Sequence, residues 1–153
     1  MTIDPGEDAV LRANHVLEYP YRRSLGPVLG RFFTSLRDGR IEGVRGDSGM
    51  VLVPPAEYDP HSGRATTEFV EVSDHGVVTT WCWVSHPLDH HLPDRPFAFA
   101  LVKLDGADTA MLHLVEAASA AEMATGMRVR AQWRSERTGH IADIVSFVSE
   151  DAP

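Results

Sequence analysis

Cysteine is almost absent from this sequence, since Cys82 is the single one among 153 residues. One cysteine cannot close a disulfide within the chain or supply the several thiolates of a structural zinc site. This scarcity favours a cytoplasmic protein. The sequence also lacks an apolar run near the ~18 residues of a membrane span, and its first residues lack the basic and apolar segments of a signal peptide. We therefore expect neither a membrane location nor export.

Basic residues are also few in this sequence. Lys and Arg total 14 against 22 Asp and Glu, so the formal net charge is -8. Non-specific binding to nucleic acid depends on clustered Lys and Arg that neutralise phosphates, and this balance opposes it. The sequence contains neither a glycine-rich phosphate loop with Lys-Ser/Thr nor a dinucleotide-binding fingerprint. We expect no nucleic-acid partner.

The hydrophobic content of 43% is enough for the core of one globular domain. Near the start of the chain, apolar residues recur at helical spacing between residues 25 and 36. Ser24 is the expected N-cap, Pro27 fits the first turn because its missing N–H costs little there, and Gly39 follows the expected end. The pattern predicts one amphipathic helix.

After this helix the sequence changes to short runs of apolar residues separated by turn residues. We expect strands over residues 41–45, 50–53, 66–72, 77–84, 97–104, 110–116, 127–134 and 141–148. In the fourth run, strict alternation places Trp81 and Trp83 on one face and Val78 and Cys82 on the other. Short antiparallel strands at this spacing are typical of a small barrel, and residues 118–124 are the other expected helix.

Four segments together resemble a known family. Two of them read Arg95-Pro-Phe-Ala-Phe-Ala-Leu-Val-Lys-Leu-Asp-Gly-Ala-Asp108 and Gly43-Val-Arg-Gly-Asp-Ser-Gly-Met-Val-Leu-Val-Pro-Pro55. The others read Leu17-Glu-Tyr-Pro-Tyr21 and Gly139-His-Ile-Ala-Asp-Ile144. They are similar to the zinc-ribbon and OB-fold family catalogued as domain of unknown function thirty-five, and the likeness extends over nearly the whole chain.

The resemblance implies a mainly β protein with three parts. Residues 1–39 would form an N-terminal arm and the amphipathic helix. Residues 40–65 would form a degenerate, rubredoxin-like zinc-ribbon hairpin. A five-stranded OB-fold barrel would follow over residues 66–153.

The ribbon is where the sequence departs from the family. There, two knuckles of the C-x₂-C type place four thiolates around Zn²⁺. The resemblance puts Gly46 and Gly49 at the first knuckle, and Asp59 with Ser62 or Gly63 at the second. None of these positions is a cysteine, so we expect no bound metal.

The resemblance also implies a function. Members of the family accompany thiolase-fold and related acyl-CoA enzymes, including sterol-carrier-type thiolases that act as aldolases in bacterial steroid side-chain degradation. The chain would then be a non-catalytic subunit that binds such an enzyme in a hetero-oligomer and helps form its CoA-binding region. It would hold no cofactor alone, because acyl-CoA would be shared with the partner. Arg95 and Lys103 border the family-like strand and are candidate contacts to the anionic CoA phosphates.

Aromatic and arginine residues are concentrated in the first quarter of the chain. Adjacent Phe32 and Phe33 point about 100° apart on a helix, so both are difficult to bury in one small domain. Arg22 and Arg23 give an acidic chain a local positive patch. Because aromatic and Arg side chains are typical of interface hot spots, the candidate partner surface consists of Tyr19, Tyr21, Arg22, Arg23, Phe32 and Phe33.

Two other functions are compatible with the sequence. An independent metal-dependent hydrolase could draw its ligands or its base from a loop that contains His86, Asp89, His90, His91 and Asp94. Loop histidines of this kind are more often solvated. An OB-fold that binds single-stranded nucleic acid could stack bases on Trp81 or Trp83, although the acidic balance opposes it.

Overall fold

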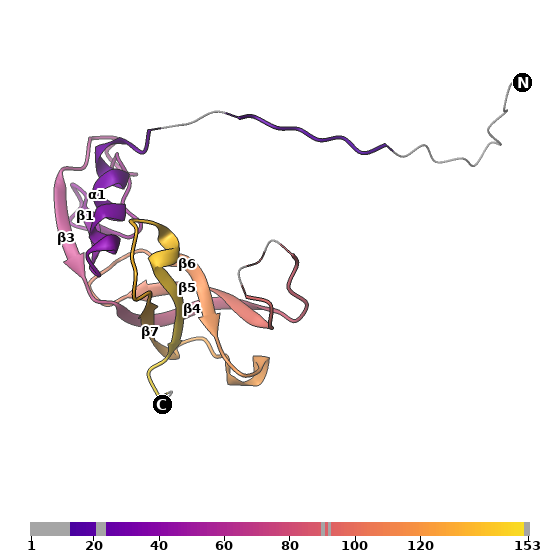
Figure 1. The fold of residues 1–153 in the computed structure, drawn as a ribbon. Helices are drawn as coiled ribbons and strands as arrows, with labels where there is room; N and C mark the ends of the chain where they lie inside the picture. Colours follow the sequence, from indigo (N-terminus) through magenta and orange to yellow (C-terminus); the bar gives the residue numbers. More distant parts are fainter. Residues whose placement is uncertain (1–12, 21–23, 90, 92, 152–153) are drawn as a thin grey trace, which may run out of the picture.

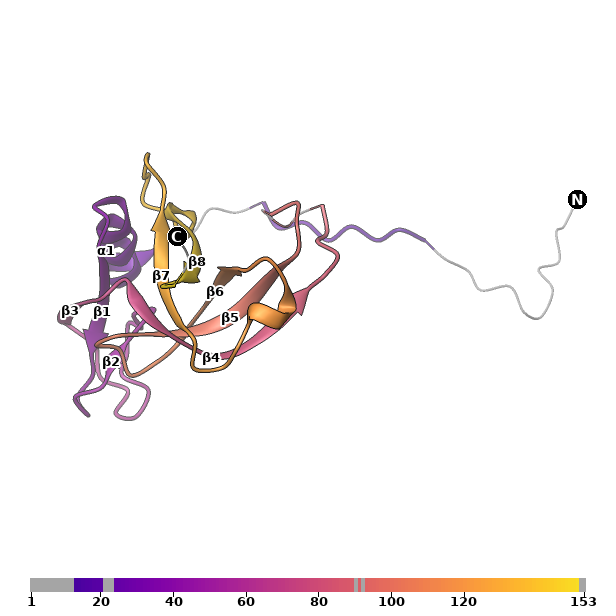
Figure 2. The same cartoon turned by 90° about the horizontal axis from the view of Figure 1, so that it is seen from below.

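A computed structural model describes residues 13–20, 24–89, 91 and 93–151. Its first part consists of one helix and a three-stranded antiparallel sheet (Figure 1). The helix α1 spans Gly26–Arg37, and the sheet has the order β2-β1-β3, formed by β1 (Ile41–Arg45), β2 (Val51–Leu52) and β3 (Glu68–Val72). The helix and this sheet lie together at one end of the molecule (Figure 2).

The second part is a closed five-stranded barrel with the order β4-β5-β6-β8-β7. Its elements are β4 (His75–Val84), β5 (Phe97–Leu104), β6 (Met111–Glu116), the 3₁₀ turn η1 (Ala120–Glu122), β7 (Arg128–Trp133), the 3₁₀ turn η2 (Ile141–Asp143) and β8 (Ile144–Ser149). The strands pair antiparallel except β6 with β8, and β7 closes on β4. A five-stranded barrel of this kind is an OB-fold. The expected fold class, mainly β with an N-terminal helix and an OB barrel, is confirmed.

The helix begins slightly later than its sequence signals indicate. Leu25 is the N-cap and makes no side-chain cap, while the Ser24 hydroxyl accepts a hydrogen bond of 3.3 Å from the Gly26 N–H. Pro27 lies in the first turn, as expected. The helix ends before Gly39, whose φ of 74° is a conformation that glycine adopts without the strain of a Cβ.

The strand β4 changes the face that it buries partway along its length. Val78 is fully buried in the barrel, and its pairing with β5 shifts register between Val78 and Thr80. Beyond the shift, Trp81 and Trp83 pack partly against the core, and Thr80 and Cys82 are exposed. A β-bulge adds one residue and so reverses the alternation. The expectation that Val78 and the tryptophans lie on opposite faces was therefore wrong, because it assumed an unbroken strand.

Three further expectations about elements are corrected. The strand at residues 66–72 was expected in the barrel, but β3 pairs with β1 over its whole length, and the barrel begins with β4. The helix expected at 118–124 is reduced to η1. The strand expected from residue 141 starts with η2, because His140 and Asp143 form a capping box that holds the backbone in a 3₁₀ turn.

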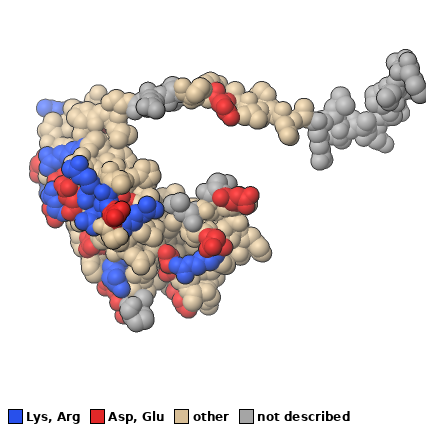
Figure 3. Space-filling view, in the orientation of Figure 1, with Lys and Arg blue, Asp and Glu red and all other residues tan. Residues whose placement is uncertain are grey.

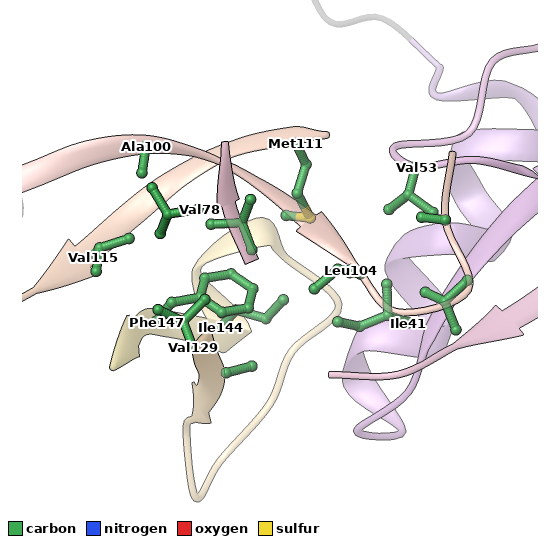
Figure 4. Close-up of a cluster of buried hydrophobic side chains, with 14 of the residues drawn as sticks. Ile41, Val53, Val78, Ala100, Leu104, Met111, Val115, Val129, Ile144 and Phe147 are labelled. Carbon is green, nitrogen blue, oxygen red and sulfur yellow. The ribbon is translucent and has the colours of Figure 1, made fainter. Parts of the chain in front are cut away.

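One continuous core joins the two parts. The barrel interior is filled by Val78, Met111, Val115, Val129 and Phe147, all at most 1% exposed (Figure 4). The same cluster continues through Leu104 to residues of the first part, which are Phe32, Leu36, Ile41, Val51, Val53 and Val72. A smaller cluster of Val28, Val44 and Leu52 lies between the helix and its sheet. The helix thus packs on the sheet and on the barrel end at once.

Charged side chains of both signs gather over α1 and the three-stranded sheet (Figure 3). They pair with each other: Arg31 with Glu42 at 2.9 Å, Arg40 with Glu71 at 3.2 Å and Arg45 with Glu68 at 2.9 Å. Residues 13–20 form no regular structure and extend away from the folded part in both views (Figures 1 and 2). Neither α1 nor any 3₁₀ turn of the described residues is long and apolar enough to cross a bilayer.

Candidate functional site

The two predicted knuckles of the ribbon do come together, around the side chain of Asp59. This residue is 3% exposed, and its Oδ1 accepts hydrogen bonds from the N–H groups of His61 (2.9 Å) and Ser62 (2.8 Å). A Cβ placed on Gly46 would lie only 1.9 Å from Asp59 Oδ2. The Ser62 hydroxyl reaches across to Asp47 at 2.9 Å. The carboxylate therefore fills the space next to position 46.

This arrangement does not fit the zinc that the fold family implies. Gly46 and Gly49 offer no side-chain ligand, and the described residues contain no group of three His, Cys, Asp or Glu side chains that could hold a metal ion. Asp59 Oδ2 is buried and has no hydrogen-bond partner among the described residues, but a single oxygen cannot replace four thiolates. Hydrogen bonds from the Ser62 backbone, opposed by burial, lower the pKa of Asp59. The two knuckle segments are thus held together around the ionised carboxylate of Asp59.

The histidine-rich loop before β5 makes packing contacts. The ring of His91 meets those of Phe97 and Phe99 edge to face, with centroid distances of 5.4 and 5.9 Å, and its Nδ1 accepts a hydrogen bond from the Leu88 N–H. His86 Nδ1 lies 3.2 Å from the Ser85 hydroxyl. His90 lies outside the described residues. Asp89 and Asp94 are exposed, and the structure does not gather them with His86 or His91 into a metal-binding group.

The two candidate CoA contacts lie near opposite ends of β5. Lys103 lies eight positions after Arg95, which corresponds to about 26 Å along an extended chain. Arg95 forms an ion pair with Glu116, whereas Lys103 is exposed opposite Val77. The two cations are therefore too far apart to bind one phosphate.

The candidate partner surface divides into a buried and an exposed part. Phe32 is 2% exposed and belongs to the core, so its assignment to the surface was wrong. Phe33 is half-buried, with its ring 5.4 Å from that of Phe32. Both are covered because α1 lies between the sheet and the segment near η2, where Arg137 donates a hydrogen bond to the Arg37 carbonyl.

Tyr19, by contrast, is 71% exposed, together with Val16 (73%) and Leu17 (67%) on the same extended segment. Tyr21, Arg22 and Arg23 lie outside the described residues.

An apolar cleft of about 310 Å³ on the barrel wall is a site that the sequence did not reveal. Its walls include Phe97, Phe99, Leu112, Leu114, Ile141 and Val145. Phe99 pairs with Leu114, and Leu101 with Leu112, across β5 and β6, which places these side chains on the outer face of the barrel. The alternating patterns of β5 and β6 indicate which of their side chains face outward. They do not indicate that η2 and β8 lie beside those side chains and complete the cleft.

His113 is one of the residues that line this cleft, and it lies on β6 beside the short pairing of β6 with β8. The strands β6 and β8 pair only at Val115 and Glu116, so the stretch that holds His113 has no ladder partner in β8. The residue is 8% exposed, and its ring packs 5.5 Å from that of Phe147. Its Nδ1 is buried without a hydrogen-bond partner in the described part of the chain. Burial lowers the pKa of His113, against the opposite effect of the Leu114 and Ile141 backbone, so the imidazole is neutral at pH 7.

A comparison with protein families finds a match to most of the barrel. Residues 69–134 match the family described as "ChsH2, C-terminal OB-fold domain". This stretch is similar to that OB-fold domain. The match covers β4 to β7 and most of β3, and β8 completes the barrel.

Two solved structures have a similar fold. One, described as "Ltp2-ChsH2(DUF35) aldolase", superposes with a TM-score of 0.65 at 21% identity, over 84% of this chain and 98% of that chain. The other, a protein of unknown function from the DUF35 family of Sulfolobus solfataricus, gives a TM-score of 0.64 at 17% identity, over 82% and 85%. No curated protein sequence matches. The expected likeness to the family of domain of unknown function thirty-five is confirmed.

Proposed function

We propose that this protein is a non-catalytic subunit that binds a thiolase-like acyl-CoA enzyme and helps form its CoA-binding region. The observation that supports the partner class is the match of residues 69–134 to the C-terminal OB-fold domain of ChsH2, a protein named with Ltp2 in an aldolase structure of the same fold. We further propose lipid or steroid side-chain degradation as the pathway class and the cytoplasm as the location, the latter because the chain has one cysteine.

The non-catalytic role is supported by how the polar side chains of the barrel are used. In the main polar cluster, Arg128 binds Asp105 through two hydrogen bonds of 2.8 and 2.7 Å and Glu150 through one of 2.9 Å. Glu150 also bonds the His75 ring at 2.9 Å. Each of these side chains already forms hydrogen bonds with another member of the cluster. This is expected of a structural network that joins β4, β5, β7 and the C-terminal end.

The exposed segment near Tyr19 is the proposed docking element for the partner. Three large apolar side chains, those of Val16, Leu17 and Tyr19, are each at least two thirds exposed on a short extended segment. Such a segment gains by burial against another protein, since each side chain of this size contributes roughly 1.5–3 kcal/mol when it is fully covered. Tyr21, Arg22 and Arg23 would extend the same contact.

The proposed contribution to CoA binding comes from Lys103 and Arg95. Both side chains are exposed, and Lys103 is the more available for a phosphate because Arg95 already forms an ion pair with Glu116. The acyl-CoA itself would be held jointly with the partner enzyme, and we propose that the subunit alone binds no cofactor.

Neither alternative function gains an observation in its favour. The described residues of the histidine-rich loop contribute packing contacts, and Trp81 and Trp83 lie partly against the core, where their faces are less available for stacking on bases.

The test is co-expression with the thiolase-fold gene encoded nearest to it, followed by purification through a tag on the partner. We expect a stoichiometric complex with acyl-CoA aldolase or thiolase activity, and substitution of Tyr19 by Ala should weaken it. A thiolase-like enzyme that assembles and acts fully without this chain would contradict the proposal.

A further inference from the structure

The apolar cleft on the barrel has the size and lining of a small-molecule site. Its volume of about 310 Å³ is at the lower end of the range for ligand pockets. Aromatic rings form part of the lining, where Phe97 and Phe99 meet at a centroid distance of 4.9 Å and His91 packs edge-on against both. Aliphatic side chains of Leu112, Ile141 and Val145 also line it. A flat ring system would therefore meet both aromatic and aliphatic surface.

The same lining restricts the charge of an occupant. No Lys, Arg, Asp or Glu side chain is among the described residues that border the cleft. A carboxylate or phosphate placed there would lose its hydration and would meet no Lys or Arg side chain, which is costly. The occupant is therefore neutral, and the CoA phosphates do not fit.

Three histidines line the cleft, His91, His113 and His140, and His113 is the buried one among them. This side chain is more than nine-tenths buried, borders the cleft, and has a buried Nδ1 that no described group satisfies. A buried polar atom without a partner is uncommon and destabilises the fold. Because a neutral imidazole carries one acceptor nitrogen, a ligand that brings a hydroxyl would complete the hydrogen bonding that the protein leaves open.

We propose that the cleft binds a neutral, flat, apolar ring compound with one hydroxyl group, which donates a hydrogen bond to His113. The rings lie against Phe97, Phe99 and the aliphatic wall. This site belongs to the OB barrel itself and does not depend on the partner enzyme proposed above.

Three matched probes test the proposal on the full-length protein: 2-naphthol, 2-methylnaphthalene and 2-naphthoate. They share two fused rings and differ in the group that meets His113. We expect saturable binding of 2-naphthol by calorimetry. Affinity should fall about fivefold to tenfold for the methyl analogue, the effect of one hydrogen bond, and further for the carboxylate. The His113 imidazole resonances should shift with 2-naphthol in NMR spectra.

Two variants connect binding to the cleft. Leu112→Arg places a charge on its wall and should abolish binding of all three probes. Leu101→Arg is the matched control, since Leu101 is the exposed neighbour of Leu112 across the strands but does not line the cleft. His113→Phe should retain ring binding and lose the preference for 2-naphthol over 2-methylnaphthalene. Thermal melting confirms that each variant is folded.

Several results would overturn the proposal. Equal affinity for the hydroxyl and methyl probes, or the same preference in His113→Phe, would remove His113 from the site. Binding that survives Leu112→Arg would place the probes elsewhere. If no probe binds while Leu112→Arg prevents assembly with the partner enzyme or with a second copy, the cleft is a protein-docking surface instead.

Discussion

The carboxylate of Asp59 occupies the space that any side chain at position 46 would need, because a Cβ on Gly46 would lie 1.9 Å from Asp59 Oδ2. We predict that Gly46→Ala destabilises the fold by about 2 kcal/mol, since overpacking of a rigid site forces the backbone or Asp59 to move. Urea unfolding measures this. Gly30→Ala is the control, because nothing lies within 4 Å of its Cβ in the helix, and it should be neutral or stabilising.

The same relationship predicts a coupling between the two residues. Combined with Asp59→Ala, the Gly46→Ala substitution should cost less than the sum of the two single changes, because the clash is then removed. Strict additivity in the double-mutant cycle would show that the two side chains do not compete for space.

Chelation should leave the fold intact. The knuckles lack cysteine and are joined by Asp59 and Ser62, so we predict purification without stoichiometric zinc and an unchanged melting temperature in EDTA. Metal analysis of protein made without an affinity tag checks the first point. A melt that collapses on chelation would show that oxygen and imidazole ligands have replaced the thiolates.

Acid should weaken the turn before β8 through Asp143. Burial raises the pKa of this carboxyl, but hydrogen bonds from the N–H groups of Thr138, Gly139 and His140 outweigh it, and the pKa is lowered overall. A lowered folded-state pKa gives stability that is present above the unfolded value near ~4 and is lost as the pH falls through the folded value.

We therefore predict that Asp143→Asn costs about 1–3 kcal/mol at pH 7, since charge-assisted bonds are lost. The difference from the parent should shrink as the pH falls below about 4. Unfolding curves at several pH values measure it. A difference that is constant with pH would mean that the charge of Asp143 contributes nothing.

Substitutions of Phe32 and Tyr19 should have different effects, one on the stability of the free subunit and the other on binding to the partner enzyme. Phe32→Ala removes a core side chain that is 2% exposed and should destabilise the free subunit by about 3–5 kcal/mol. Tyr19→Ala should leave the melt nearly unchanged and weaken binding to the partner enzyme by ~2 kcal/mol, about thirtyfold. Assembly that is indifferent to Tyr19 would place the docking surface elsewhere.

Lys103→Ala should raise KM for acyl-CoA in the assembled complex without much change in kcat, the pattern of lost uniform binding. Arg95→Ala should have a smaller effect, because Arg95 is already paired with Glu116. Steady-state kinetics with each variant show whether Lys103 or Arg95 contributes more to CoA binding. An unchanged KM in both would remove the two residues from the CoA region.

The sequence was a sufficient guide to elements whose signals are local. Alternation over residues 97–104 predicted β5 with its observed bounds, and Gly39 marked the end of α1, because pleat and helix termination depend on neighbouring residues. The same reasoning failed where pairing with a distant strand changed the direction of the side chains. The bulge after Val78 turned Trp81 and Trp83 toward the core, and no local pattern reports an extra residue that only pairing with β5 defines.

The candidate site shows the same division. By itself, the sequence determined that the knuckles lack thiolates and that Arg95 and Lys103 border one strand, since residue identity and strand periodicity suffice for both. Only the tertiary structure decided that Asp59 fills the space beside Gly46, that Phe32 is core, and that His113 borders an apolar cleft. Burial and unmet hydrogen bonds depend on which distant segments pack together, and the order β4-β5-β6-β8-β7 is set by the whole chain.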